Sequence, residues 1–353
     1  MSEPCTNWSA FRSLDSIVDF LRGGLSCTKK GIPGTMNRSS TTDLKLDNIA
    51  QAARAIDPVF RNSPQFVDEQ LCAALGRRTI VKVETANPIR SFKGRGTDFF
   101  MRALDPKLKV VCASAGNFGQ ALAYSGRTRG IAVEVFASTD VNPLKVERMR
   151  SLGATVTIIG STFEAAKQHA RQKTEKQSGL MFVEDGADPA ISEGAGTIGV
   201  ELLRAGDIDT IVLPVGDGAL ITGVGTWVKE HSPKTKIIGV CASGSPAMVE
   251  SWRAGRSIAS AEANTIADGI AVTVPIAKSV ERMQAVVDDM VLVNDAQLLD
   301  AMRVAASTLG LVLEPSGAAG LAAIRVHNLP GDQLATVLTG SNIHPQLLAE
   351  LFR

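Results

Sequence analysis

One lysine, Lys93, lies between an aromatic residue and a glycine in the stretch Asn87-Pro88-Ile89-Arg90-Ser91-Phe92-Lys93-Gly94-Arg95-Gly96. An apolar, strand-like run (residues 80–84) precedes this stretch, and a helix-like run (residues 97–104) follows it. An amine enclosed by apolar groups favours its neutral, nucleophilic form. A lysine in a polar surface turn is the alternative interpretation, so the rest of the chain has to decide between the two.

The bulk composition is that of an ordinary globular protein. The chain has 353 residues, of which 44% are hydrophobic and 21% charged, so two domains, or one domain with an insertion, are expected. The net charge of +1 does not favour nucleic acid or an anionic membrane as a partner, and no apolar run is long enough to cross a bilayer. The five scattered cysteines favour reduced thiols and a cytoplasmic protein, and no metal-ligand spacing occurs.

Strand and helix patterns alternate over most of the chain. Short apolar runs, each followed by a helical pattern, begin near residues 110, 133, 155, 210 and 236. This alternation predicts an α/β fold with parallel sheets that helices cover on both faces. Residues 64–75 are expected to form one helix that ends at Gly76. Residues 1–45 are interpreted as an N-terminal extension, a loop or a mobile arm.

Four further motifs are candidates for binding. Ser114–Gln120 (SAGNFGQ) and Val215–Leu220 (VGDGAL) each join an expected strand to a helix, where free backbone amides bind anions. Leu338–Asn342 (LTGSN) follows a strand, and Glu314–Gly320 (EPSGAAG) begins a helix of small residues. Taken singly, each has an ordinary explanation in helix capping or turn formation. None is a dinucleotide fingerprint or a P-loop, so nicotinamide cofactors and ATP are poorly supported.

Taken together and in order, the motifs NPIRSFKGRG, SAGNFGQALAYSGR, GDGALITG, TIADGIAV, EPSGAAGLAA and LTGSNI resemble those of fold type II pyridoxal-phosphate (PLP) enzymes, in the serine/threonine dehydratase (threonine ammonia-lyase) family. The resemblance covers residues 64–342. It implies a tryptophan synthase β-like fold, with two open twisted sheets flanked by helices. It also implies a homodimer, a large PLP-binding domain (46–108 and 186–353) and a small domain (109–185).

The resemblance implies a role for each motif. Lys93 would form the Schiff base with pyridoxal 5'-phosphate, with Phe92 against the ring. Asn117 would meet the ring hydroxyl and Thr339 the pyridine nitrogen. The remaining cofactor-binding residues would be Gly216, Asp217, Gly218, Ala219 and Leu220 around the phosphate, and Glu314 beside the site. The implied substrate-binding residues are Ser91, Ser114, Ala115, Gly116 and Arg90.

The implied reaction is β-elimination, in which a β-hydroxy amino acid such as threonine or serine is dehydrated and deaminated to a 2-oxo acid and ammonia. Lys93 would abstract the α-proton as general base. The neutral Thr339 favours elimination over transamination, and Ala115, which carries no exchangeable proton, argues against racemisation. The Gly-Val-Glu-Pro carboxylate that several relatives use for a divalent cation is missing near Cys241, so no metal is expected.

Three positions in these motifs depart from the family pattern. Dehydratases of this kind usually carry a small residue where Arg90 stands, and its guanidinium would either recognise a second anionic group or point into solvent. Asp217 and Ala219 interrupt a phosphate loop that is richer in glycine in the family. Because a carboxylate is repelled by a phosphate, the Asp217 side chain is expected to turn outward.

Three alternatives stay open. A β- or γ-replacement enzyme, similar to a cysteine or threonine synthase, would use the same fold. A diaminopropionate ammonia-lyase is disfavoured because its relatives carry an acidic residue at the position of Ala115. Outside enzymes, the chain would be a cofactor-binding scaffold protein.

Overall fold

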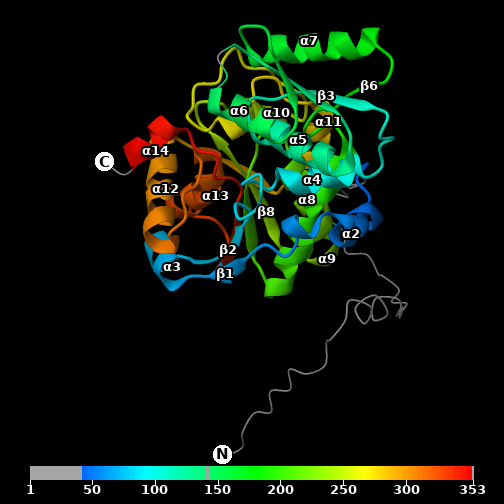
Figure 1. Cartoon of the computed structure of the whole chain (residues 1–353). Helices are drawn as coiled ribbons and strands as arrows, with labels where there is room; N and C mark the ends of the chain where they lie inside the picture. The colour runs from blue at the N-terminus through cyan, green and yellow to red at the C-terminus, as the bar shows by residue number, and fades with distance from the viewer. Residues whose placement is uncertain (1–41, 140, 142, 352–353) are drawn as a thin grey trace, which may run out of the picture. The chain divides into compact units, whose positions relative to one another are not determined.

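A computed structural model describes residues 42–139, 141 and 143–351 of the chain, and these form the predicted α/β fold. Two sheets, each with helices packed against it, make up this part of the protein (Figure 1). The predicted extension of residues 1–45 lies outside the described residues, apart from its last four.

The first sheet, as far as the chain is described, has six strands in the order β1-β2-β10-β7-β8-β9. Neighbouring strands run parallel, except that β1 pairs antiparallel with β2 at one edge. Because parallel strands are buried on both faces, most of their residues are apolar. The strands are β1 (Gln65–Val67), β2 (Arg78–Val83), β7 (Thr210–Pro214), β8 (Lys236–Ala242), β9 (Asp289–Val293) and β10 (Gln333–Leu338).

The second sheet has four described strands, all parallel, in the order β5-β4-β3-β6. They come from one continuous stretch of chain between β2 and β7, so the second sheet is an insertion into the first along the sequence. These strands are β3 (Lys109–Ala113), β4 (Val133–Ala137), β5 (Thr155–Ile158) and β6 (Leu180–Phe182). All four lie within the segment 109–185 that was expected to be a small domain; the division into domains stays a prediction.

Helices follow most strands and bury their apolar sides. The helix α8 packs against both α4 and α9, and α7 lies against β3 and β4 of the second sheet. The α-helices are α2 (Leu46–Ala55), α3 (Glu69–Leu75), α4 (Lys93–Met101), α5 (Asn117–Arg129), α6 (Pro143–Ser151), α7 (Phe163–Lys176), α8 (Pro189–Leu202), α9 (Ala219–His231), α10 (Ala247–Ala254), α11 (Ala277–Val286), α12 (Asp295–Leu309), α13 (Pro315–Val326) and α14 (Pro345–Leu351). Three short 3₁₀ helices are η1 (Pro58–Phe60), η2 (Leu203–Ala205) and η3 (Asp268–Ile270).

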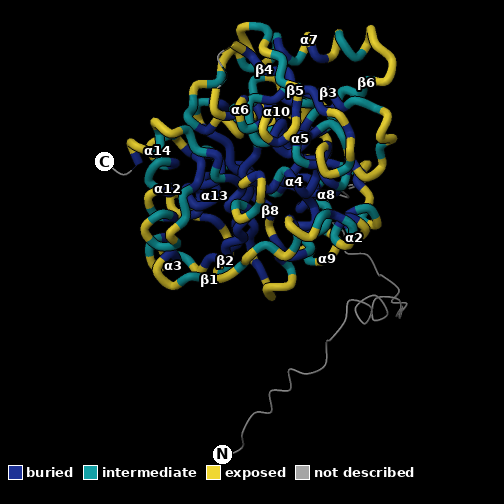
Figure 2. Tube along the Cα trace, in the orientation of Figure 1, coloured by how far each residue is buried: buried dark blue, intermediate teal, exposed yellow. Residues whose placement is uncertain are grey.

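The strands of the first sheet divide the apolar core into two clusters. Ile80 and Ile211 pack into one cluster, whereas their neighbours Val81 and Val212 pack into the other. Successive side chains of a strand point to opposite faces, so each face of the sheet has its own core. Figure 2 shows the resulting buried trace through the strands and the exposed loops around it.

One element differs from the sequence-based expectation. The helix predicted for residues 64–75 is wrong at its start, because residues 65–67 form the edge strand β1 and α3 begins only at Glu69. The Asp68 carboxylate accepts the N–H of Leu71 at 2.7 Å and so caps α3 at this point. The helix ends at Gly76, in the left-handed conformation, as expected. No helix among the described residues is long and apolar enough to span a membrane.

Candidate active site

A cavity of about 970 Å³ lies where strands of both sheets end. Its walls include the segments that follow β2, β3, β6, β7 and β10, the start of α13, and residues of α6, α7 and η3. Ligands of α/β proteins bind at this carboxyl edge of parallel strands. The cavity brings together most of the predicted site residues, namely Phe92, Lys93, Ser114, Ala115, Gly116, Asn117, Gly216, Asp217, Gly218, Ala219, Leu220, Glu314 and Thr339.

Lys93 is the first residue of α4, and its side chain is 16% exposed. Its backbone N–H donates to Ser91 Oγ at 3.2 Å. Its amine is hydrogen-bonded to the Asp185 carboxylate and lies 4.6 Å from the centre of the Phe92 ring. The lysine therefore enters the cavity with one carboxylate and one aromatic ring as neighbours.

A buried charge cluster fixes the helix that carries this lysine. Arg95 is fully buried and donates to Glu84 at 2.8 Å and to Glu201 at 2.8 and 2.9 Å. Lys82 adds a second cation, 2.7 Å from Glu201. Burial acts to raise the pKa of Glu201, but the hydrogen bonds and charges of Arg95 and Lys82 lower it to about 2. Two cations and two carboxylates thus join α4 to β2 and α8.

Asn117 lies in a chain of hydrogen bonds at the cavity wall. Its Nδ2 donates to Glu314 Oε1 at 2.5 Å, and its Oδ1 accepts from Asn342 Nδ2 at 2.7 Å. Burial, and after it the charge of Asp268, raises the pKa of Glu314 to about 7. Since an amide nitrogen carries two hydrogens, Asn117 keeps one donor for a ligand.

The turn between β7 and α9 has the form of an anion site. Gly218 has a φ of 88°, which glycine adopts without strain, and it leads directly into α9. The N–H of Thr222 is bonded to the Gly218 carbonyl at 3.0 Å, whereas the amides of the first turn have no partner within the helix. These amides border the cavity and suit a phosphate group.

Two carboxylates stand near Lys93. Asp185 is 7% exposed, and while one of its oxygens is bonded to Lys93, the other is buried without a hydrogen-bond partner. Asp217 borders the cavity and is partly buried. Burial, and next the charge of Asp185, raises the pKa of Asp217 to about 7. The two loops touch, because a Cβ on Gly186 would stand 2.1 Å from the Asp217 carbonyl oxygen.

Two hydroxyl groups, those of Thr339 and Ser316, lie close to the carboxyl end of β10. Thr339 Oγ1 donates to the Ser316 carbonyl at 3.4 Å, and the Thr339 carbonyl accepts the N–H of Phe92 at 3.0 Å. Ser316 is 3% exposed, and its Oγ has no hydrogen-bond partner. The cavity therefore holds one buried hydroxyl that is available to a ligand.

Two predicted substrate-binding residues do not border the cavity. Ser91 is fully buried, and its hydroxyl oxygen accepts the backbone N–H of Lys93. Arg90 is exposed, with a φ of 52°, and its charge contributes, after burial, to lowering the pKa of Arg148. The segment that carries Arg90 contacts α6, because Arg148 donates to the Pro88 carbonyl at 3.2 Å.

Sequence reasoning missed several polar residues of the cavity wall, including four that interact with predicted site residues. These four are Lys145, Asp185, Asp268 and Ser316. Asp268 and Ser316 stand inside the motifs TIADGIAV and EPSGAAGLAA, so their position in a motif was a usable signal. Lys145 and Asp185 belong to no recognised motif.

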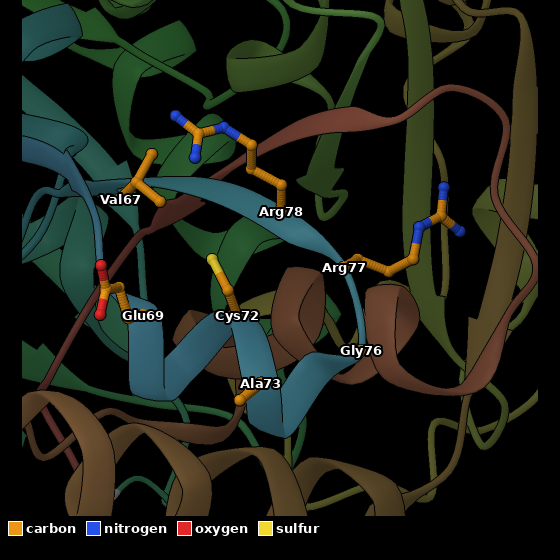
Figure 3. Close-up of a pocket in the computed structure, with 7 residues that line it drawn as sticks. All are labelled: Val67, Glu69, Cys72, Ala73, Gly76, Arg77 and Arg78. Carbon is orange, nitrogen blue, oxygen red and sulfur yellow. The ribbon is translucent and has the colours of Figure 1, made fainter.

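A second pocket, of about 370 Å³, lies at the opposite end of β2. Figure 3 shows that its side chains come from α3, from β1 and from the start of β2. Cys72 in this pocket accepts the N–H of Thr79 at 3.3 Å. The pocket contains none of the predicted site residues, so the chemistry belongs to the larger cavity.

Residues 56–340 match the family described as pyridoxal-phosphate dependent enzymes. The chain belongs to this family. It is 33% identical, over 86% of its length and 77% of the relative's, to an L-threonine ammonia-lyase of Thermotoga maritima. It is 31% identical to the chloroplastic biosynthetic threonine dehydratase 2 of Solanum lycopersicum, and it spans 55% of that protein's length.

Solved structures of the family have the same fold. The processed form of threonine deaminase isoform 2 from Solanum lycopersicum is 31% identical, with a TM-score of 0.79 over 92% of this chain and 93% of that one. Maize serine racemase is 26% identical, with a TM-score of 0.81 over 88% of this chain and 97% of that one. These likenesses agree with the fold type II architecture expected from the motifs.

The cavity suits the family's cofactor, which is pyridoxal 5'-phosphate. The Lys93 amine supplies the Schiff-base partner that this cofactor needs. The unpaired amides at the start of α9 suit its phosphate, and the buried Ser316 hydroxyl is free to bind a polar atom of a ligand. The residues present therefore fit this PLP-dependent enzyme family.

Proposed function

We propose that this pyridoxal-phosphate enzyme is an ammonia-lyase, which eliminates the β-hydroxyl of an amino acid such as threonine or serine and releases a 2-oxo acid and ammonia. The observation that carries the proposal is the amine of Lys93, enclosed in the cavity between an aromatic ring and a carboxylate. The relatives named threonine ammonia-lyase and threonine dehydratase support the same reaction class.

The residues proposed to hold the cofactor are assigned from their positions in the cavity. The first-turn amides of α9, from Gly218 onward, take the phosphate, and Phe92 lies against the ring. Asn117 donates its remaining hydrogen to the ring hydroxyl, because its other polar atoms are bonded to Glu314 and Asn342. The hydroxyl of Thr339 faces the pyridine nitrogen.

The proton chemistry is assigned to Lys93. When bound, PLP withdraws electrons and makes the α-proton of an amino-acid substrate acidic. The Lys93 amine takes this proton as general base, and the Asp185 carboxylate stabilises the ammonium that results. Ala115 has no proton to deliver to the opposite face of Cα, which favours elimination over racemisation.

Replacement of the lysine tests the assignment. Lys93→Ala is expected to lose the visible absorbance of the covalently bound cofactor and to lower kcat by at least about 10²–10⁴-fold. Lys278→Ala, which removes an exposed lysine of α11, serves as the matched control and keeps both properties. Full lyase activity in Lys93→Ala would overturn the proposal.

A substrate panel tests the reaction class. L-threonine, L-serine and bulkier, aromatic or acidic β-hydroxy amino acids are incubated with the enzyme, and ammonia and 2-oxo acid are measured. Release of both in equal amounts supports the lyase. If β-substituted products form only with an added thiol, and no ammonia is released, the chain is a replacement enzyme instead.

A second candidate rests on the carboxylate pair. Asp185 keeps one buried oxygen without a partner beside Asp217, and such a pair favours a substrate whose β-substituent is an ammonium group. The corresponding reaction is a diaminopropionate ammonia-lyase, so 2,3-diaminopropionate belongs in the panel. A kcat/KM at least tenfold above that for threonine and serine would select this candidate.

The proposal extends to assembly, compartment and domains. We infer a cytoplasmic homodimer with a small domain at residues 109–185. The continuous second sheet supports the domain division, and the free thiols of Cys72, Cys112 and Cys241 agree with a reducing compartment. Light scattering of the purified holoenzyme measures the mass, and a monomer would contradict the dimer.

A further inference from the structure

One ion pair of the cavity joins its two walls. Lys145 projects from α6, which packs against β5 and α5 of the second sheet. Asp268 belongs to η3, which packs against α13 beside the first sheet. Their side chains are hydrogen-bonded across the cavity, and both residues border it. The pair has no part in the assignments made above.

The two partners differ in their access to water. The side chain of Lys145 is 11% exposed, whereas that of Asp268 is 56% exposed. A buried ammonium needs a counter-ion, because its loss of hydration is not otherwise offset. A half-exposed carboxylate is well hydrated without its partner. Lys145 therefore requires an anion beside it, while Asp268 can be replaced in this role.

The amine of Lys145 lies next to the turn that precedes α5. A Cβ placed on Gly116 would stand 3.6 Å from Lys145 Nζ. The Ser114 hydroxyl accepts the N–H groups of Gly116 and Gly119 at 3.2 and 2.9 Å and so shapes this turn. Gly116, Asn117 and Phe118 at the start of α5 line the same cavity as the lysine. The turn was expected to receive the carboxylate of the substrate.

The charge of Lys145 also affects Glu314, another residue of the cavity wall. It acts to lower the pKa of Glu314, whereas Asp268, the larger of the two influences, raises it. An anion that displaces Asp268 would meet the lysine at the wall that carries Asn117 and Glu314. The same cavity holds Lys93, the residue to which removal of the α-proton is assigned.

We propose that Lys145 receives the α-carboxylate of the amino-acid substrate, and that Asp268 holds this lysine until the substrate displaces it. The inference rests on the proposed amino-acid lyase function. Binding exchanges one ion pair for another, so the substrate competes with a carboxylate of the protein itself. The two partners then act on affinity in opposite directions, which a purely structural ion pair does not do.

The test measures binding of L-alanine to the holoenzyme through the change in cofactor absorbance. L-alanine has the α-carboxylate but no β-leaving group, and L-alaninamide serves as the matched ligand without the carboxylate. Lys145→Gln is expected to raise the Kd for L-alanine by about 10–100-fold and to remove the preference over L-alaninamide. Asp268→Asn is expected to lower the Kd for L-alanine by about 3–10-fold, since the competitor is gone.

Controls separate recognition from folding. Lys145→Arg keeps the cation and is expected to retain the preference for L-alanine, and Lys229→Gln removes a lysine from another ion pair, with Asp288, outside the cavity. If Lys145→Gln does not fold, Asp268→Asn still decides, because the exposed side chain tolerates the change. Weaker L-alanine binding in Asp268→Asn, or an unchanged Kd in Lys145→Gln, would overturn the proposal.

The same experiment keeps the two proposals apart. A wild-type enzyme that discriminates L-alanine from L-alaninamide through Lys145, but turns over no β-hydroxy or diamino acid, contradicts the lyase function and supports the carboxylate site. An enzyme that releases ammonia from threonine with unchanged KM in Lys145→Gln supports the lyase function and contradicts the carboxylate site.

Discussion

At the scale of single residues, Gly340 shows how closely the site is packed. A Cβ at this position would stand 1.9 Å from Glu314 Oε1 and 3.1 Å from Asn117 Nδ2. The absence of a side chain thus lets the turn after β10 lie against the hydrogen bond between Asn117 and Glu314. A methyl group there must displace the carboxyl group, the amide or the turn itself.

Gly340→Ala is therefore expected to weaken cofactor binding and to lower the free energy of unfolding by about 1–3 kcal/mol, as overpacking does. Spectroscopic titration of the apoenzyme with PLP and urea unfolding measure the two effects. Gly76→Ala, at the end of α3 and at a φ of 68°, is the matched control. It should destabilise by about 1 kcal/mol and leave the affinity for PLP unchanged. Equal PLP affinity in both variants would contradict the prediction.

The residues of the site differ in how far the sequence predicts them. Lys93, Asn117 and the turn at Gly218 lie in short strand–turn–helix motifs, so their chemistry depends on neighbours in the chain. The importance of Lys145 and Asp185 depends on partners far away, Asp268 and Lys93. No local pattern encodes such a pairing, and only the fold brings these side chains together.

At the scale of elements, α4 is held by charge as well as by apolar packing. Arg95 projects from its first turn into a fully buried position, where it meets Glu84, directly after β2, and Glu201 of α8. The charges are balanced, because Lys82 accompanies Arg95 against Glu84 and Glu201. The position of Lys93, two residues earlier, depends on this cluster.

Arg95→Met is expected to lower the free energy of unfolding by about 3–5 kcal/mol, because it leaves two buried carboxylates with a single cation. Urea unfolding at neutral pH measures the change. Lys236→Met, which removes a 53%-exposed lysine from its contact with Asp288, should alter stability by less than about 1 kcal/mol. A loss of similar size in both variants would show that the cluster does not stabilise the helix.

Elements also differ in how far the sequence predicts them. The strands β3, β4, β7 and β8 are short apolar runs before helices, a pattern that the sequence displays openly. The strand β1 has three residues and pairs with β2, which follows it, in the opposite direction. Three residues are too few to show the alternation of a strand, and the pairing with β2 is a tertiary contact. The sequence pattern therefore places residues 65–67 in the helix, although Asp68 caps α3 after them.

At the scale of the whole molecule, two raised pKa values predict how stability depends on pH. The carboxyl groups of Asp217 and Glu314 have a pKa of about 7 in the folded protein, against 3.8 and 4.5 ordinarily. At pH values between the unfolded-state pKa and the folded-state pKa, these groups bind more protons in the folded chain than in the unfolded chain. The free energy of unfolding therefore falls as pH rises through this range. Glu201 acts in the opposite sense, because its pKa of about 2 lies below 4.5, and its contribution is lost as pH falls through that range.

The cofactor-free protein is therefore expected to lose stability between about pH 4 and pH 7 through Asp217 and Glu314. The double variant Asp217→Asn/Glu314→Gln lacks both groups and should lose less stability over the same range. Urea unfolding of both proteins at pH 5 and pH 8 gives the difference, in which the other titrating groups cancel. An identical pH dependence would contradict the raised pKa values.

The pairing of β2 with β10 has a consequence for biosynthesis. β2 is completed early on the ribosome, but its parallel neighbour is among the last strands to be translated. The second sheet, encoded in one continuous stretch, can fold first, because its contacts are closer in sequence. Until the chain has emerged past Asn342, β2 has only the short strand β1 beside it, its other edge is open, and Lys93 lacks part of its pocket. The complete cofactor pocket is therefore expected to form only late in synthesis. Before that point the open edge of β2 is exposed to aggregation, and chaperones would protect it.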